Sequence, residues 1–178
     1  MYQEVLSFWF EEIEPKMWWA ADPGFDEQIR ARFLGLLHQA AQGELYAWRR
    51  EPAGRLAEVV VLDQFSRNIH RNTPLAFAQD PMALVLAQEA IGIGTHKGLS
   101  PTERSFLLLP FMHSESTQIH IWAESLYREF APPSNYELEL KHKAIIDRFG
   151  RFPHRNAILG RASSPEEAEF LKQPGSSF

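Results

Sequence analysis

The chain has 178 residues, of which 44% are hydrophobic and 12% aromatic, and it carries a formal net charge of -5 at pH 7. This length suits one domain, residues 1–178, with enough apolar material for a sizeable core. The sequence contains no cysteine, which excludes disulfides, thiolate nucleophiles and cysteine-bound metals. The acidic charge argues against nucleic acid as a partner, because nucleic-acid binding normally requires a strongly basic surface.

The sequence predicts neither a leader segment nor a membrane span. The first residues, Met1 to Glu4, lack basic side chains, and the longest apolar run, Phe106 to Met112, is interrupted by a proline. A spanning helix needs roughly 20 apolar residues. We therefore expect a cytoplasmic protein without a membrane partner.

Helix signals recur along the chain. Asp22 and Pro23 start an amphipathic segment that Gly43 ends, and Asp80 has the position of an N-cap before Pro81. Two further starts have capping-box spacing, Ser100 with Glu103 and Ser164 with Glu167. These patterns predict helices over residues 2–14, 24–42, 52–70, 81–92, 101–113, 117–130, 136–149 and 165–172, with a short turn or helix near 155–159.

We find no sustained alternation of apolar and polar residues between hairpin turns, so we predict no sheet. The clearest linker is APPSN at residues 131–135. Short connections favour antiparallel helix pairs, and the predicted fold is therefore all-α, either a bundle or a short α-α superhelix. The sequence shows no fixed internal period.

The predicted helix over residues 52–70 becomes polar toward its end. Apolar residues surround it between Leu56 and Phe65, which is typical of a buried helix. At about 100° per residue, one sector collects Asp63, Gln64, Arg67, Asn68 and Arg71. Asp63 and Arg67, four residues apart, can pair. The sector is either a structural ion pair that fixes helix packing or part of a binding site.

Two histidines also interrupt apolar faces. His142 lies on a stripe with Leu138 and Ile145, and its simplest interpretation is a core histidine with satisfied hydrogen bonds. His113 shares a face with Phe106 if the helix continues through Pro110. Glu115 follows at the end of that helix and is the first candidate for a carboxylate partner.

The segment at residues 148–161 is cationic although the chain is acidic. It contains four arginines and His154, without a carboxylate. We expect Gly150 to end the helix before it and Pro153 to stiffen the turn. The guanidinium group suits a bidentate grip on carboxylate or phosphate. We predict that this segment completes an inward-facing polar cluster with residues 63–71, His113 and His142.

Three segments, VVVLDQFSRNIHRNTPLAFAQDP, LPFMHSESTQ and FGRFPHRNAILGR, resemble the bacterial family catalogued as domain of unknown function 924. The resemblance extends from VLSFWF to SSPEEAEFL, which is nearly the whole chain. It implies an α-α superhelix similar to tetratricopeptide-repeat folds, and it brings no established activity. The recurring positions of the family include Asp63, Gln64, Arg67, Asn68, Arg71, His113, Glu115, His142 and Arg151 to Asn156. Ser66 departs from the family, where proline is common.

These observations leave three interpretations open. In the first, the cluster binds a small anionic ligand, and a histidine in it can move a proton near neutral pH. The candidate ligand-binding residues are Asp63, Arg67, Asn68, Arg71, His113, Glu115, His142, Arg151, His154, Arg155 and Asn156. In the second, a tetratricopeptide-like scaffold binds a protein or an acidic peptide. In the third, the cluster is purely structural.

The sequence assigns no catalytic residues, because it contains no nucleophile elbow or phosphate-binding glycine loop. We predict no metal and no cofactor. His113 and Glu115 are two residues apart, a spacing that does not place both on one helix face, and the chain has no HExxH motif. Trp9, Trp18 and Trp19 lie close together in the sequence, and we interpret them as part of the core rather than as an exposed binding surface.

Overall fold

The structure, a computed structural model, describes residues 1–177. Its α-helices are α1 (Tyr2–Ser7), α2 (Pro23–Ala41), α3 (Pro52–Val60), α4 (Ser66–Ile69), α5 (Asp80–Gly92), α6 (Pro101–Met112), α7 (Thr117–Phe130), α8 (Pro133–Phe149) and α9 (Pro165–Phe170). Two π-helical turns are η1 (Phe8–Glu12) and η4 (Val61–Phe65). The 3-10 turns are η2 (Pro15–Trp19), η3 (Tyr46–Arg50), η5 (Pro74–Phe77), η6 (Thr95–Gly98) and η7 (Pro153–Arg155). The described residues contain no strand, which confirms the predicted all-α fold.

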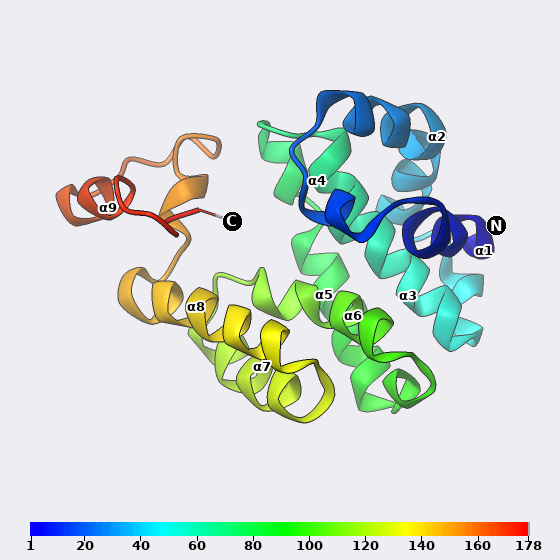
Figure 1. Ribbon diagram of the computed structural model, residues 1–178. Coiled ribbons are helices and arrows are strands. Elements are labelled where there is room, and N and C mark those ends of the chain that lie inside the picture. Colours follow the sequence, from blue (N-terminus) through cyan, green and yellow to red (C-terminus); the bar gives the residue numbers. More distant parts are fainter. Residues whose placement is uncertain (178) are drawn as a thin grey trace.

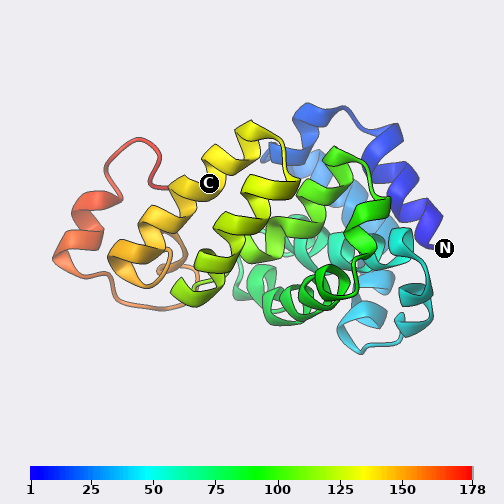
Figure 2. The ribbon, with the colours of Figure 1, turned by 90° about the horizontal axis from the view of Figure 1, so that it is seen from below.

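The helices form a curved row (Figure 1). Helix α3 is central and packs against α1, α5 and α6, while its continuation η4 packs against α2. The row then continues through the neighbouring pairs α5 with α6, α6 with α7 and α7 with α8. Figure 2 shows that α9 and the loops beside it lie at the end of the molecule opposite the N-terminus. The curvature brings α8 and the segment that follows it to the side of the row on which α4 lies.

The helices of this row have unequal lengths. Helices α3, α5, α6, α7 and α8 contain 9, 13, 12, 14 and 17 residues. A tetratricopeptide array repeats one helical hairpin at a constant period, and these lengths show no such period. The predicted α-helical pairs are present, and the likeness to tetratricopeptide repeats stays a prediction.

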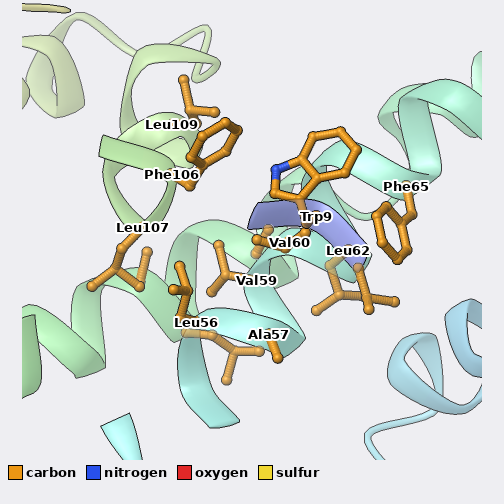
Figure 3. Close-up of a cluster of buried hydrophobic side chains, with 14 of the residues drawn as sticks. Trp9, Leu56, Ala57, Val59, Val60, Leu62, Phe65, Phe106, Leu107 and Leu109 are labelled. Carbon is orange, nitrogen blue, oxygen red and sulfur yellow. The ribbon is translucent and has the colours of Figure 1, made fainter. Parts of the chain in front are cut away.

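The main core lies where the N-terminal segment crosses α3 and α6. Trp9 from η1 is fully buried and makes edge contacts with Phe65 and Phe106, with ring centroids 5.4 and 5.9 Å away. Figure 3 shows these rings above the apolar residues of α3. Burying each large apolar side chain stabilises the fold by about 1.5–3 kcal/mol. A smaller core at the C-terminal end contains Ile145, Ile146 and Phe152.

Several helix ends were predicted correctly. The carboxylate of Asp22 accepts a hydrogen bond from the backbone N–H of Phe25, 2.8 Å away. The two predicted capping boxes, at the starts of α6 and α9, are both formed. Gly150 adopts the left-handed conformation, φ 68°, and ends α8. Helix α6 continues through Pro110 to Met112, so Phe106 and His113 lie on the same side.

Other predictions were wrong in detail. The helix expected over residues 52–70 is divided by the π turn η4, because its hydrogen bonds shift register there. Helix α8 begins at Pro133 inside the predicted linker, since proline suits the first turn of a helix. Asp80 is the first residue of α5 rather than its N-cap, and its carboxylate binds an arginine instead.

None of the helices in the described part of the chain is long and apolar enough to cross a membrane.

Candidate functional site

A cavity of about 510 Å³ lies between α4 and the C-terminal part of the row. Its cationic and imidazole side chains are Arg67, Arg71, Arg155, His113, His142 and His154. Its amides and aromatic rings are Gln64, Asn68, Asn72, Asn135, Trp18, Trp19, Phe77 and Phe152. Among the described residues that line this cavity there is no carboxylate, hydroxyl or amine side chain. The rest of the lining is aliphatic and consists of Ala20, Ala76, Leu109, Met112, Leu138 and Ile158. The wall therefore combines arginine, imidazole and amide groups with aromatic and aliphatic side chains.

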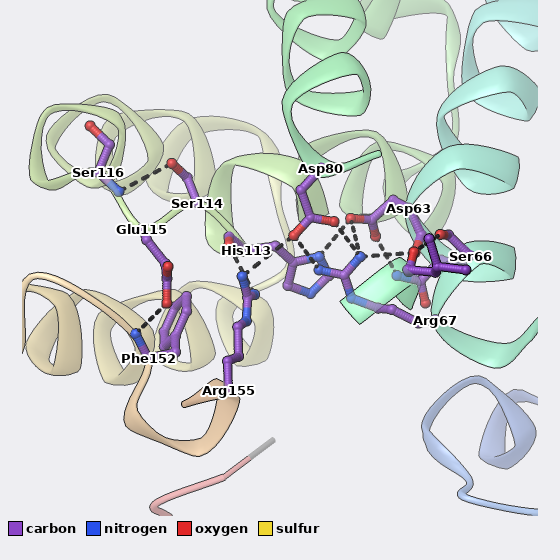
Figure 4. A network of polar contacts seen from close by, with 12 residues as sticks. Asp63, Ser66, Arg67, Asp80, His113, Ser114, Glu115, Ser116, Phe152 and Arg155 are labelled. Carbon is purple, nitrogen blue, oxygen red and sulfur yellow. Dashed lines mark hydrogen bonds and ion pairs between the residues drawn. The ribbon is translucent and has the colours of Figure 1, made fainter. Parts of the chain in front are cut away.

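Arg67 is fixed by two carboxylates behind the wall (Figure 4). Its Nη1 donates to Asp63 Oδ1 at 3.1 Å and to Asp80 Oδ1 at 2.8 Å, and its Nη2 donates to Asp80 Oδ2 at 3.0 Å. The predicted pair of Asp63 with Arg67 is thus confirmed, although the second partner, Asp80, was missed. Burial alone would raise the pKa of Asp63, but Arg67 and His113 outweigh it and hold that pKa well below its usual range.

Arg71 is fixed in the same way by a carboxylate from α2. Its Nε and Nη2 donate to the two oxygens of Asp26 at 2.5 and 2.8 Å, and Asn68 donates to the same carboxylate at 2.8 Å. Burial opposes ionisation of Asp26, yet the hydrogen bonds from Arg71 and Asn68 lower its pKa overall. One edge of Arg71 remains accessible, with 33% of its side chain exposed.

Arg155 lies between two aromatic rings. Its guanidinium carbon is 4.6 Å from the centroid of Phe77 and 4.7 Å from that of Phe152. Its Nη2 donates to the backbone carbonyl of His113 at 3.0 Å, and its Nη1 lies 3.4 Å from Asp80. Burial, together with the nearby charge of Arg67, lowers the pKa of Arg155 to about 10, so it stays protonated at neutral pH.

His113 follows the last residue of α6 and points back toward η4. Its Nδ1 lies 2.7 Å from Asp63 Oδ1. Because Asp63 is ionised and accepts this bond, Nδ1 carries the proton and Nε2 has a free electron pair. Burial and the charge of Arg67 lower the pKa of His113, while Asp63 opposes them. The imidazole is therefore neutral at pH 7, and 16% of the side chain is exposed.

The other two histidines of the cavity are neutral as well. Burial lowers the pKa of His142 to about 3. Burial and the charge of Arg155 lower the pKa of His154 to about 4. The predicted inward orientation of His142 is confirmed, since its ring is buried and its Nδ1 lies 2.8 Å from the carbonyl of Leu138. At neutral pH the positive charge of the cavity wall therefore comes from the arginines.

Four of the predicted site residues do not line the cavity: Asp63, which binds Arg67 and His113, and Glu115, Arg151 and Asn156. Arg151 binds Glu167 with Nε and Nη2 at 2.7 and 2.8 Å. Glu115 accepts hydrogen bonds from Arg161, and the amide of Asn156 donates to Ser163 at 3.0 Å. The left-handed turn at Gly150 redirects the chain, so Arg151 points toward α9. From the cationic segment, Arg155 and His154 thus reach the cavity with Arg67, Arg71, His113 and His142, while Arg151 and Asn156 do not.

The carboxylates that neutralise the cationic segment come from elsewhere in the chain, as the structural interpretation required. Arg148 binds Glu166 at 2.9 Å, and Arg161 binds Glu115 at 2.6 Å. Only Arg155 of the four arginines in the segment lines the cavity. The segment therefore contributes fewer arginines to the cavity than predicted.

Sequence reasoning missed the aromatic part of the site. Trp9 is buried in the core and Trp18 packs against that core, as predicted, but Trp18 and Trp19 also line the cavity, and 60% of Trp19 is exposed. The indole N–H of Trp18 donates to the carbonyl of Trp9 at 2.8 Å, and its ring contacts Phe106, so Trp18 lies between the core and the cavity. A high density of aromatic residues cannot by itself separate core rings from rings at a cavity edge. Apart from its position near a helix start, nothing in the sequence indicated that Asp26 binds Arg71.

No group of three or more His, Cys, Asp or Glu side chains suitable for a metal ion occurs in residues 1–177. His120, in α7, has both ring nitrogens bonded, to Glu139 at 2.7 Å and to the carbonyl of Ser114 at 2.8 Å.

The fold and the site together define an all-α protein whose cavity is lined by arginines and neutral histidines. The chain belongs to a family described as "Bacterial protein of unknown function (DUF924)", which matches residues 5–175 and confirms the resemblance. A solved structure of a protein of unknown function from Agrobacterium tumefaciens is similar, with 36% sequence identity, a TM-score of 0.91 and coverage of 96% of each chain. No curated protein matches the chain. The fold and the family are established, and neither carries an assigned activity.

Proposed function

We propose that the cavity binds a small anionic ligand with an aromatic or apolar part. The observation that supports this proposal is a wall with three arginines and no carboxylate among its described residues. Guanidinium groups bind carboxylate and phosphate through paired N–H donors. Trp18, Trp19 and Phe77 offer faces against which the rest of such a ligand can pack.

The carboxylates that pair with these arginines hold them in place from behind. Asp26, Asp63 and Asp80 bind the arginines but do not line the cavity. A binding group held by partners outside the site loses little freedom when the ligand arrives. The same ion pairs also fit the structural interpretation. The cavity itself favours the ligand, because an ion-pair cluster that only fixed packing would need no open space beside it.

The size of the cavity favours a small molecule over a peptide. Sites for small ligands typically enclose about 300–1,000 Å³, and this cavity is about 510 Å³. An acidic peptide would need a groove that continues past the site. The neighbouring cavity of about 370 Å³ shares His113 and Arg155 with the site, but its lining includes Asp80 and Glu115, whose charge disfavours an acidic chain. A cytoplasmic location stays a prediction.

Thermal melting tests the proposal, since a ligand that binds only the folded protein raises its stability by RT ln(1 + [L]/Kd). The probes are benzoate, phenylacetate, phenyl phosphate, inorganic phosphate and a short acidic peptide. We expect a saturable rise for at least one aryl anion in the wild type. At 100 times Kd the gain is about 2.7 kcal/mol.

Arg71→Lys and Arg151→Ala form a matched pair of variants. Arg71→Lys keeps the charge beside Asp26 but removes the fork, so it should reduce the melting shift. Arg151→Ala lies outside the cavity and should keep the full shift, even if its own melting temperature falls. Equal shifts in all three proteins, or no shift with any probe, would contradict the proposal.

A further inference from the structure

We propose that the Asp63–His113 pair is a general-base dyad, so that the cavity is an active site for proton transfer on the anion it binds. This inference rests on the proposed function, because it needs the ligand in the same cavity. It adds a reaction to what would otherwise be a binding site.

His113 is oriented with Nδ1 toward Asp63. Its Nδ1 binds Asp63 at 2.7 Å, and only 1% of the Asp63 side chain is exposed. A buried, ionised carboxylate on Nδ1 fixes the tautomer and leaves the electron pair on Nε2. In the described part of the chain Nε2 has no hydrogen-bond partner, although His113 lines the cavity. Buried polar groups are usually hydrogen-bonded, and the core histidine His120 has both ring nitrogens bonded, whereas His96 is buried with neither bonded. His113 differs from both because one nitrogen is held by a carboxylate and its side chain lines a cavity.

Both members of the dyad are held in place by neighbouring side chains. Arg67 binds Asp63 through both the carboxylate and the backbone carbonyl, at 3.1 and 2.9 Å. Gln64 also donates to the carboxylate of Asp63. Arg155 binds the backbone carbonyl of His113 at 3.0 Å. These contacts fix both members of the dyad, which is the arrangement that efficient proton transfer requires.

The described lining of the cavity has no side chain that commonly acts as a nucleophile, apart from its histidines. Its described lining contains no serine, threonine, tyrosine, lysine, aspartate or glutamate, and the chain has no cysteine. The described lining of this cavity therefore offers no hydroxyl, carboxylate or amine nucleophile to a ligand bound there, whereas Ser114, Asp80 and Glu115 lie on the other side of His113, in the lining of a neighbouring cavity. The imidazole can instead take a proton from water or from the ligand itself. A hydrolase of small anionic esters and an enzyme acting on carbon acids share this chemistry.

In the hydrolytic case, the water O–H bond breaks as its oxygen bonds to the acyl carbon, and the proton moves to Nε2. The bond from that carbon to the leaving oxygen then breaks, and Nε2 returns the proton to the departing group. In the carbon-acid case, the C–H bond next to a carbonyl breaks, the proton moves to Nε2, and the electron pair becomes an enolate. Arg71 or Arg155 holds the anionic end of the ligand in both cases. Asp63 is a positioning residue, since it acts through His113.

Two probes separate these cases. Mono-4-nitrophenyl succinate is an anionic aryl ester, and release of 4-nitrophenolate reports its hydrolysis. 4-Phenyl-2-oxobutanoate is an anionic carbon acid, and proton NMR in D₂O reports exchange at the carbon next to its carbonyl. Melting shifts for both probes are measured in parallel. Wild type is compared with His113→Gln, Asp63→Asn and the control His38→Gln, which changes an exposed histidine of α2.

We expect one of the two reactions to exceed the buffer rate in the wild type and in His38→Gln. His113→Gln should lower kcat about 100-fold or more, which is the usual contribution of a general base, while the melting shift persists. Asp63→Asn should lower kcat with little change in KM. A purely structural role for Asp63 would lower the melting temperature without this separation.

Binding of the probes without any reaction above background would overturn the inference and leave the binding proposal intact. An unchanged rate in His113→Gln would also overturn it. Absence of a melting shift with every probe would contradict the proposed function and this inference together. If Asp63→Asn does not fold, diethyl pyrocarbonate on the wild type replaces it. Bound phenyl phosphate should then protect His113 from modification, and an unreactive His113 in the free protein would contradict an open Nε2.

Discussion

Arg161 donates two hydrogen bonds to the carboxylate of Glu115, at 2.6 and 2.9 Å. The same carboxylate accepts the backbone N–H of Phe152 at 2.7 Å. This contact ties the segment after α8 to the loop after α6. Because Phe152 and Arg155 from that segment line the cavity, Glu115 shapes the site without touching its interior.

We expect Glu115→Ala to loosen this connection. The substitution leaves the Phe152 N–H without its acceptor and removes two of the hydrogen bonds that Arg161 donates, which should cost about 1–3 kcal/mol. Hydrogen exchange should become faster in residues 150–163 and stay unchanged in α3. Glu166→Ala removes an exposed ion pair with Arg148 and should cost less than about 1 kcal/mol. Equal effects of the two substitutions would mean that Glu115 holds nothing in place.

We predict that Asp80→Asn strengthens anion binding while it weakens the fold. Asp80 lies behind Arg67 and Arg155 and neutralises part of their charge. Removing this charge should lower the Kd of an aryl anion by roughly fivefold, about 1 kcal/mol. Titration calorimetry gives the Kd, and denaturant unfolding gives the stability. Asp147→Asn on α8 is the control. Weaker binding in Asp80→Asn would show that the geometry of the arginines matters more than their net charge.

Acid should destabilise the protein through His142. Its folded pKa of about 3 lies below the ordinary value of 6.5, so the unfolded chain binds the proton more tightly. Stability from this group is complete above pH 6.5 and is lost as the pH falls toward 3. At pH 4 the loss is about 3 kcal/mol. Urea unfolding from pH 7 to pH 4 should show a shallower pH dependence for His142→Gln than for the wild type. Parallel curves would contradict the buried, neutral imidazole.

Two glycines provide a matched test of packing. A Cβ atom on Gly54 would lie 2.1 Å from the backbone oxygen of Trp48, whereas one on Gly35 would meet no atom within 4 Å. We expect Gly54→Ala to cost about 2 kcal/mol or more, because the backbone at the start of α3 must move. Gly35→Ala should stabilise α2 by about 0.5–1 kcal/mol. Chemical denaturation measures both, and a neutral Gly54→Ala would show that this turn adjusts easily.

Local signals in the sequence predicted most of the helices. Capping boxes and proline positions depend on residues close in the chain, which is why Ser100 and Ser164 were placed correctly. The site depends on contacts between distant residues. The partners Asp26 and Arg71 are 45 residues apart, and Arg155 and Asp80 are 75 apart. Spacing along a single helix cannot reveal such pairs, so the arginines were recognised while most of their carboxylate partners were not.

The orientation of the Arg151 side chain could not be predicted from the sequence either. Its neighbour Gly150 was correctly expected to end α8, but the direction that the chain takes afterwards depends on how α9 packs. Arg151 and Arg155 therefore looked equivalent, although one binds Glu167 and the other lines the cavity.

The π turn η4 makes this site depend on chain length as well as on residue identity. The turn holds an extra residue relative to an α-helix, just before Arg67, Asn68 and Arg71. Five residues at π-helical pitch turn the chain about as far as four residues of an α-helix, so the extra residue is absorbed without turning the following side chains away from the cavity. Loss of one codon between Val61 and Phe65 would therefore let a regular helix form with the arginines still facing the wall, whereas loss of one codon in α3 itself would rotate everything after it by about 100°. The place of a deletion in this segment, and not its length alone, decides whether the arginines reach the cavity.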